Sequence, residues 1–306
     1  MVSDPVQFLF NENINIFFRD TGTPLLDTLF RVITNVLSQP VYIFFASLIF
    51  WCLNKRIGIR AMYIIMFSAY TALLAKNLFG MPRPPDYLHK VTENDFGFPS
   101  GHAQVSSGFW SYLGLQSKRT RIIIVGAVAV ILVSLSRLYL GVHYPGDVVG
   151  GIIFGLMVAF ISYKGEPGIL KIFNKQNRNS KYLIALFLPI ILVLITTIQG
   201  NLLKEHIELG LLMASVGAGY LLQEEIIRFP DVKNKKQNVK RAVIGILILG
   251  SIYLISEILS LIFPVFAYIK YAALGFSSVF FVPWVFMKLE MNHTPCNCNT
   301  YPIKEF

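Results

Sequence analysis

The chain has 306 residues, of which 54% are hydrophobic and 14% are charged, and its mean hydropathy is +0.58. This composition is much more apolar than that of a soluble globular domain and excludes an ordinary water-soluble protein. The formal net charge is +10, but the basic residues form short clusters between apolar runs and no nucleic-acid-binding motif accompanies them. We therefore expect a membrane protein and no nucleic-acid partner.

Apolar runs long enough to cross a bilayer, which takes about 20 residues, recur along the whole chain. They predict an all-α fold, a polytopic transmembrane helical bundle of about eight or nine spans. Eight spans are expected at residues 40–53, 57–79, 101–116, 122–140, 146–163, 182–199, 207–222 and 242–263. A ninth, at 268–287, is less regular because Pro283 interrupts it and could kink the helix.

Two shorter apolar stretches precede the first span. Residues 6–18 could lie flat at the membrane interface, whereas residues 25–36 could lengthen the first span or pack beside it. The amino-acid pattern leaves both possibilities open for the second stretch.

The three cysteines do not suggest a disulfide scaffold, because Cys52 lies in an apolar run and Cys296 and Cys298 form a short pair in the tail. His293 beside that pair leaves a metal site as an alternative, but an inert tail motif is the more common case. We expect no metal and no other cofactor.

The basic residues indicate the orientation of the chain in the membrane. Most of the 27 lysines and arginines fall in one alternating set of segments, at 55–60, 118–121, 164–181 and 228–241 and in the tail. The positive-inside rule places this set in the cytoplasm. The intervening loops, at 80–99, 141–145, 200–206 and 264–268, then lie on the extracytoplasmic or lumenal face, and a bacterial plasma membrane is the expected location.

The first two of three polar segments lie on that outer face. In the first, an apolar helix ends at Lys76, and a Gly/Pro turn then presents Arg83. In the second, Ser100 is a good N-cap, Gly101 allows close approach of the backbone to a ligand, and His102 follows at the start of a helix. A helix N-terminus with free N–H groups favours an anion. Alone, a snorkelling lysine or an incidental histidine would explain each segment.

The third polar segment brings more ionisable groups to the same face. Arg137 lies near the outer end of one span, the chain turns at Gly141, His143 follows, and Asp147 falls in the first turn of the next span after Pro145. Charged groups this close to a hydrocarbon core are costly and tend to mark a functional site.

The three cations and the second helix start are suited to holding a phosphate. Arg83 and Arg137 can each bind phosphate oxygens with two N–H groups, and Lys76 adds a point charge. The backbone from Ser100 to His102 can donate further N–H groups to the charge that spreads over the phosphate in a transition state.

The two histidines are candidates for two different catalytic roles. His143 is the better candidate for the nucleophile, because Asp147 lies four residues further on and could hold its other ring nitrogen. His102 is then the candidate general acid that protonates the leaving oxygen.

These residues resemble the complete signature of a known family, the type-2 phosphatidic acid phosphatase superfamily. The matching segments are Lys76-x6-Arg83-Pro84, Pro99-Ser100-Gly101-His102 and Ser136-Arg137-x5-His143-x3-Asp147. The resemblance implies an all-helical, metal-independent phosphatase core that works through a phosphohistidine intermediate. It covers residues 1–165 and leaves 166–306 as additional transmembrane helices and a cytoplasmic tail. Longer members, such as sphingosine-phosphate phosphatases, are the nearer architectural analogy, whereas the soluble haloperoxidases of the superfamily do not fit the apolar composition.

The expected function is therefore hydrolysis of the terminal phosphate of a membrane lipid. Phosphatidic acid, a sphingoid-base phosphate, phosphatidylglycerol phosphate and a polyprenyl diphosphate all present such a group, and no motif distinguishes among them. A membrane transporter and a catalytically inactive lipid-phosphate-binding relative are the alternatives. The oligomeric state is left open.

The second half of the chain carries fewer signals. Glycines at Gly146, Gly150, Gly151 and Gly155, and small residues at 210, 214 and 217, have the spacing of closely packed helices. Glu257 lies inside an apolar run and could face a substrate vestibule, pair with Lys270 or be an internally bonded structural residue.

Overall fold

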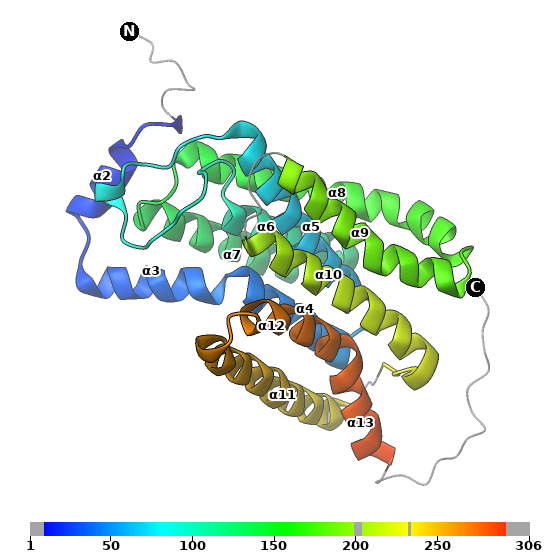
Figure 1. Cartoon of the computed structure of the whole chain (residues 1–306). Coiled ribbons are helices and arrows are strands. Elements are labelled where there is room, and N and C mark those ends of the chain that lie inside the picture. Colours follow the sequence, from blue (N-terminus) through cyan, green and yellow to red (C-terminus); the bar gives the residue numbers. More distant parts are fainter. Residues whose placement is uncertain (1–8, 199–203, 232–233, 292–306) are drawn as a thin grey trace.

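The structure is a computed structural model that describes residues 9–198, 204–231 and 234–291. Within these residues every regular element is a helix (Figure 1). The α-helices are α2 (Asn13–Asp20), α3 (Pro24–Val36), α4 (Gln39–Cys52), α5 (Lys55–Phe79), α6 (Gly101–Ser117), α7 (Thr120–Tyr139), α8 (Pro145–Asn174), α9 (Arg178–Ile198), α10 (Lys204–Leu222), α11 (Lys235–Ile262), α12 (Phe266–Phe276) and α13 (Val282–Met291). The expected all-α fold is confirmed. The tail motif with His293, Cys296 and Cys298 lies outside the described residues.

Six described helices are long and apolar enough to cross a membrane, or seven if the bent pair α3 and α4 is one span. The expected number of eight or nine was approximate, because it also counted α6 and α10 as separate spans. These helices have 17 and 19 residues and carry many polar side chains. Because other helices surround them, they do not need a continuous apolar surface.

The helices α5, α6 and α8 form the centre of the first half of the chain. Small residues allow α8 to approach α6 closely: a Cβ at Gly151 would lie 2.5 Å from the Ser100 carbonyl oxygen, and one at Gly155 would lie 2.3 Å from that of Gln104. The glycines of α8 therefore allow close packing of this helix against α6, as their spacing predicted. The same holds for Gly210 on α10, where a Cβ would lie 2.5 Å from the Val193 side chain on α9.

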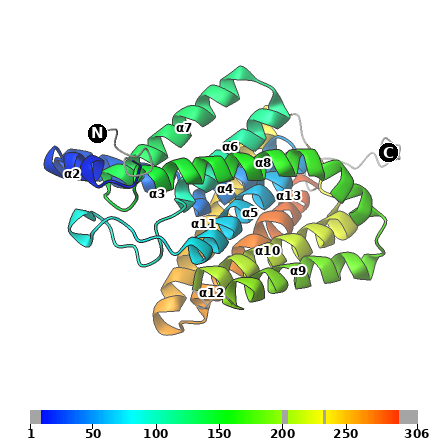
Figure 2. The ribbon, with the colours of Figure 1, turned by 90° about the horizontal axis from the view of Figure 1, so that it is seen from above.

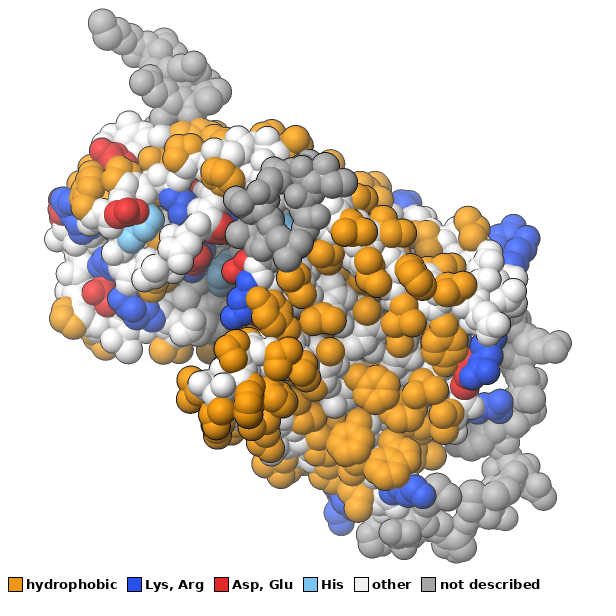
Figure 3. All heavy atoms as spheres, viewed as in Figure 1, with side chains coloured by type: hydrophobic (Ala, Val, Ile, Leu, Met, Phe, Trp, Pro, Cys, Tyr) orange, Lys and Arg blue, Asp and Glu red, His pale blue; other side chains and the backbone are white. Residues whose placement is uncertain are grey.

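The outer surface of the bundle is strongly apolar. Figure 3 shows a broad band of hydrophobic side chains over the middle of the molecule, whereas charged side chains gather at its two ends. On α11, for example, Leu254 is 62% exposed and Leu261 is 86% exposed. An apolar surface of this extent is stable only next to hydrocarbon. The protein is therefore an integral membrane protein.

The expected ninth span is present, and Pro283 does not break it. A helix of 24 residues runs from Phe266 to Leu289 and contains a π-helical turn at Ser277–Phe281, which ends two residues before the proline. Proline lacks an N–H for the helical ladder, and a local π adjustment is one way in which a membrane helix re-satisfies the freed backbone groups. The indole N–H of Trp51 donates to the Ser278 carbonyl oxygen at 2.7 Å, so the irregular backbone keeps a partner.

The apolar stretch at 25–36 forms α3, which leads into α4 through a bend of 49°. It packs beside α7 and helps to enclose the end of the bundle where α2 and the loop between α5 and α6 also lie (Figures 1 and 2). In the second half, Glu257 on α11 accepts a hydrogen bond from Lys270 on α12, with 2.5 Å between Oε1 and Nζ. Of the alternatives for Glu257, the pair with Lys270 is the one observed.

Candidate active site

Two loops and a helix start meet at one end of the bundle (Figure 2). The α5 helix ends at Phe79 and is capped by Gly80, which has φ +57° and donates its N–H to the Lys76 carbonyl oxygen at 2.9 Å. Lys76 therefore lies in the last helical turn. Pro82 and Pro84 flank Arg83 in the following segment, and each proline restricts the backbone around the arginine.

The start of α6 differs in one respect from the N-cap that the sequence predicts. Ser100 occupies the cap position, but its hydroxyl caps no backbone N–H and is buried without a hydrogen-bond partner. Its backbone N–H donates to the Asp147 carbonyl oxygen at 2.9 Å, which joins the second and third polar segments. A Cβ built at Gly101 would meet nothing within 4 Å, so the helix start faces open space. A buried hydroxyl without a partner is costly and is available to a ligand.

The third segment holds His143 from both sides. Gly141, with φ +73°, approaches the Leu88 carbonyl oxygen so closely that a Cβ would lie 1.9 Å from it, so only glycine fits this turn. Asn15 on α2 donates to the His143 carbonyl oxygen at 3.1 Å. On the other side, His143 Nδ1 lies 3.3 Å from Asp147 Oδ2, which also accepts the Tyr144 backbone N–H at 2.9 Å.

The partner of the second ring nitrogen defines the tautomer of His143. Its Nε2 lies 3.1 Å from Arg83 Nη1. Because a guanidinium has only donors, Nε2 must accept this hydrogen bond, and the ring proton is then on Nδ1, facing Asp147. The Nε2 lone pair therefore points toward the cations.

Two carboxylates that the sequence interpretation missed pair with the three cations. Asp95 binds Lys76 Nζ and Arg83 Nη2, and Glu93 binds Arg137 Nη2 and lies 3.5 Å from Arg83 Nη2. The three cationic side chains are at most 9% exposed. The three cations and the two carboxylates thus form one charged cluster. Its positive charge is partly balanced by acidic side chains of the loop between α5 and α6.

Electrostatics at this site favour ionised Asp95 and neutral His143. Burial alone would raise the pKa of Asp95, but Lys76 and Arg83 outweigh it and hold that pKa below its usual range. Burial lowers the pKa of His143 well below its usual value, and the nearby Arg83, Arg137 and Lys76 lower it further. His143 is therefore an unprotonated base at neutral pH.

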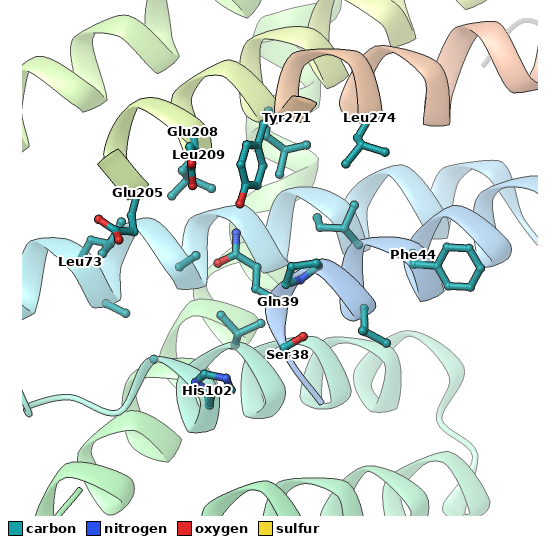
Figure 4. Close-up of a pocket in the computed structure, with 18 of the residues that line it drawn as sticks. Ser38, Gln39, Phe44, Leu73, His102, Glu205, Glu208, Leu209, Tyr271 and Leu274 are labelled. Carbon is teal, nitrogen blue, oxygen red and sulfur yellow. The ribbon is translucent and has the colours of Figure 1, made fainter. Parts of the chain in front are cut away.

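The cluster opens into a cavity of about 680 Å³. Of the predicted site residues, six line it: Lys76, Arg83, Gly101, His102, Arg137 and His143. Ser100 and Asp147 lie behind this wall and are fully buried. Figure 4 shows His102 at the same side of the cavity as Leu73, which lies one helical turn before Lys76. All eight predicted residues thus belong to one region.

Some partners of the site carried only a weak signal in the sequence. Glu93 and Asp95 occur in the same loop as Arg83, so ion pairing with the cations could have been anticipated. Asn15 and Thr34 carried no such signal: Thr34 accepts a hydrogen bond from Arg137 at 3.1 Å although it is 103 residues away in the chain. Among the described residues, no group of three or more His, Cys, Asp or Glu side chains has the geometry of a metal site.

Two family models match the chain. Residues 57–171 match the PAP2 superfamily, and residues 208–294 match the transmembrane extension of PAP2 superfamily phosphatases. The chain belongs to the PAP2 superfamily. The first match contains the three polar segments, so the family resemblance inferred from them is confirmed, and the second contains most of the C-terminal half.

Relatives with curated names match the first half. The chain is 32% identical over 126 residues to the undecaprenyl-diphosphatase of Sulfolobus acidocaldarius, which covers 40% of this chain and 61% of the relative. It is 35% identical over 101 residues to phosphatidylglycerophosphatase B of Bacillus subtilis, which covers 30% and 49%. The chain thus spans about half to three fifths of the length of these relatives.

The crystal structure of a PAP2-type phosphatidylglycerolphosphate phosphatase from Bacillus subtilis superposes with a TM-score of 0.45 at 25% identity, over 52% of this chain and 85% of that one.

Proposed function

We propose that this protein hydrolyses the terminal phosphate of a membrane lipid through a phosphohistidine intermediate. One observation carries the proposal: three buried cations and two histidines gather at one end of a cavity whose remaining wall is largely apolar. Such a cavity suits a molecule with a phosphate at one end and a hydrocarbon chain at the other.

The substrate phosphate binds to Lys76, Arg83 and Arg137, in place of the carboxylates that pair with these cations in the structure. A carboxylate and a phosphate offer similar oxygen acceptors to an arginine, so the same donors serve both. The buried Ser100 hydroxyl and the first N–H groups of α6 supply further hydrogen bonds. These donors stabilise the charge that develops on the phosphoryl oxygens.

In the first chemical step the Nε2 lone pair of His143 attacks phosphorus, and the bond from phosphorus to the lipid oxygen breaks. His102, which enters this step in its protonated form, donates a proton to that oxygen, so the lipid leaves as an alcohol or, from a diphosphate, as a monophosphate. In the second step water attacks the phosphohistidine, and His102 accepts a proton from it. Inorganic phosphate is released, and both histidines return to their starting state.

Asp147 supports the nucleophile in this scheme. Its Oδ2 faces His143 Nδ1 at 3.3 Å, so it keeps the proton on Nδ1 and stabilises the positive ring that forms when Nε2 is phosphorylated. The backbone N–H of Tyr144 holds the carboxylate in this position.

The proposed reaction uses no metal ion, because the cations and the histidines perform the roles that a metal ion would otherwise take. The named relatives act on undecaprenyl diphosphate and phosphatidylglycerophosphate, which share a terminal phosphate on a lipid. We place the active site on the extracytoplasmic face, because the loops that form it alternate with the basic loops.

The test is phosphate release by the purified full-length protein in detergent with excess chelator, assayed on phosphatidic acid, a sphingoid-base phosphate, phosphatidylglycerol phosphate and a polyprenyl diphosphate. We expect release from at least one of them, and inhibition by orthovanadate. Release that chelator abolishes and magnesium restores would contradict the metal-free mechanism. No release from any of the four would contradict the proposed activity.

A further inference from the structure

The cavity continues beyond the cations, between two parts of the chain. One wall is formed by α4 and α5 and includes Phe44 and Leu73, whereas the facing wall is formed by α10, α11 and α12 and includes Leu209, Leu249 and Leu274. On α5 the lining extends from Ala69 to Lys76, which is about 10 Å at roughly 1.5 Å per residue. The C-terminal helices therefore complete a cavity that begins at the phosphate site.

The α11 helix presents one face to this cavity. Ile246, Leu249, Gly250 and Tyr253 all line it, and their spacing corresponds to a single helical face. A Cβ built at Gly250 would meet nothing within 4 Å. Because Ile246 and Tyr253 are also 43% exposed, the cavity opens sideways along α11, where the surrounding bilayer lies.

The lining beyond the cations is mostly apolar, and its polar side chains are few: Ser38, Gln39, Glu205, Glu208, Tyr253, Tyr271 and Ser278. In Figure 4, Glu205 lies beside Leu73, Phe44 and Leu274 lie on the other side, and Gln39 and Tyr271 lie between them. Glu208 also pairs with Lys204 at 3.5 Å. Because most of the lining away from the cations is apolar, an apolar chain is the occupant that suits it, since a strongly polar group would lose most of its hydrogen bonds there.

We propose that α10, α11 and α12 form the wall of a binding site for one hydrocarbon chain of the lipid phosphate, and that this wall sets which chains are hydrolysed efficiently. This inference rests on the proposed function. A lipid chain in the bilayer is already surrounded by hydrocarbon, so its transfer into the cavity gains little hydrophobic free energy. The site acts instead by orientation: a chain that fits between α5 and the C-terminal helices aligns the phosphate with the cations and with His143.

Gly250 offers a direct test, because a Cβ at this position meets nothing within 4 Å and the ring of Gly250→Phe would extend into the cavity that Gly250 lines. Phenylalanine also has a higher helix propensity than glycine, so the substitution does not weaken α11. Gly168→Phe on α8 is the matched control: a Cβ at this helical glycine also meets nothing within 4 Å, and Gly168 does not line the cavity.

The assay compares kcat/KM for hexyl, decyl and hexadecyl phosphate with kcat/KM for an activated aryl phosphate, which has no chain, in one detergent. For Gly250→Phe we expect the ratio of hexadecyl to aryl phosphate to fall at least about tenfold, since a misplacement of about 1 Å at the reacting group can cost up to about 10²-fold, and the ratio for hexyl phosphate to fall less. Gly168→Phe should keep the wild-type ratios.

Equal losses on all four substrates, or unchanged ratios in Gly250→Phe, would overturn the inference while leaving the proposed function intact. If the wild-type protein hydrolysed none of the four substrates, this result would instead count against the proposed function. Should Gly250→Phe not accumulate as folded protein, Leu274→Trp makes the same test from α12. Its control is Ile269→Trp, because the Ile269 side chain lies on the same helix and is 43% exposed. The same changes in the substrate ratios would support or overturn the inference.

Discussion

The two carboxylates at the proposed phosphate site lead to a prediction that separates stability from ligand binding. Asp95 pairs with Lys76 and Arg83, so a phosphate that binds these cations must displace it. Asp95→Asn keeps the shape of the side chain and removes its charge. We expect the variant to be less stable without ligand and to bind phosphate or orthovanadate more tightly.

The magnitude follows from the burial of the pair. Breaking a fully buried ion pair costs about 3–5 kcal/mol because the other charge stays buried. The side chains of Lys76 and Arg83 are 9% and 7% exposed, but that of Asp95 is 31% exposed, so solvent reduces the cost to about 2 kcal/mol. Since about 1.4 kcal/mol corresponds to a factor of ten, recovery of most of this free energy on binding lowers the inhibition constant for orthovanadate about tenfold.

The assay is inhibition of aryl phosphate hydrolysis by orthovanadate, combined with thermal unfolding in detergent with and without inorganic phosphate. Asp86→Asn is the control, because Asp86 lies in the same loop and its side chain is fully exposed. Weaker inhibition of Asp95→Asn by orthovanadate would refute the reasoning, since it would mean that Asp95 positions the cations for the ligand instead of competing with it.

Three further predictions concern the chemistry and the orientation. His143→Ala should lower turnover at least about 10³-fold and leave no trapped phosphoenzyme, whereas His102→Ala should slow alkyl phosphates far more than an activated aryl phosphate; equal losses on both substrates would contradict the general-acid role. Because the pKa of His143 lies well below 6.5, its neutral form persists as the pH falls, so kcat/KM for the aryl phosphate should not decline between neutral pH and 6.5, and a half-maximal decline above 6.5 would be inconsistent with this base. In a variant without native cysteines, a cysteine at Asp86 should react with an impermeant thiol reagent on intact cells, and one at Asn234 only after the membrane is opened; the reverse pattern would overturn the orientation.

Agreement between sequence and structure is closest where the signal is local. The positions of α5, α7, α8 and α11 follow from their apolar runs, and the start of α6 follows from Ser100 and Gly101. The number of spans was less certain because α6 and α10 are polar helices inside the bundle, whose environment is set by their neighbours. The region around Pro283 is a similar case: a carbonyl oxygen of its π turn, that of Ser278, accepts a hydrogen bond from Trp51, which lies far away in the chain on α4.

The membrane setting, the helical class and the residue types of the proposed phosphate site follow from the amino-acid sequence, because hydropathy and motif spacing are properties of short segments. The surroundings of those residues are known from the three-dimensional fold alone. It brings Asn15 to the His143 carbonyl, Thr34 to Arg137, and Glu93 and Asp95 to the cations. It also joins α10–α12 to the cavity that begins at Lys76. Contacts of this kind depend on how helices far apart in the chain pack against one another, and no periodicity within a single helix encodes its partner.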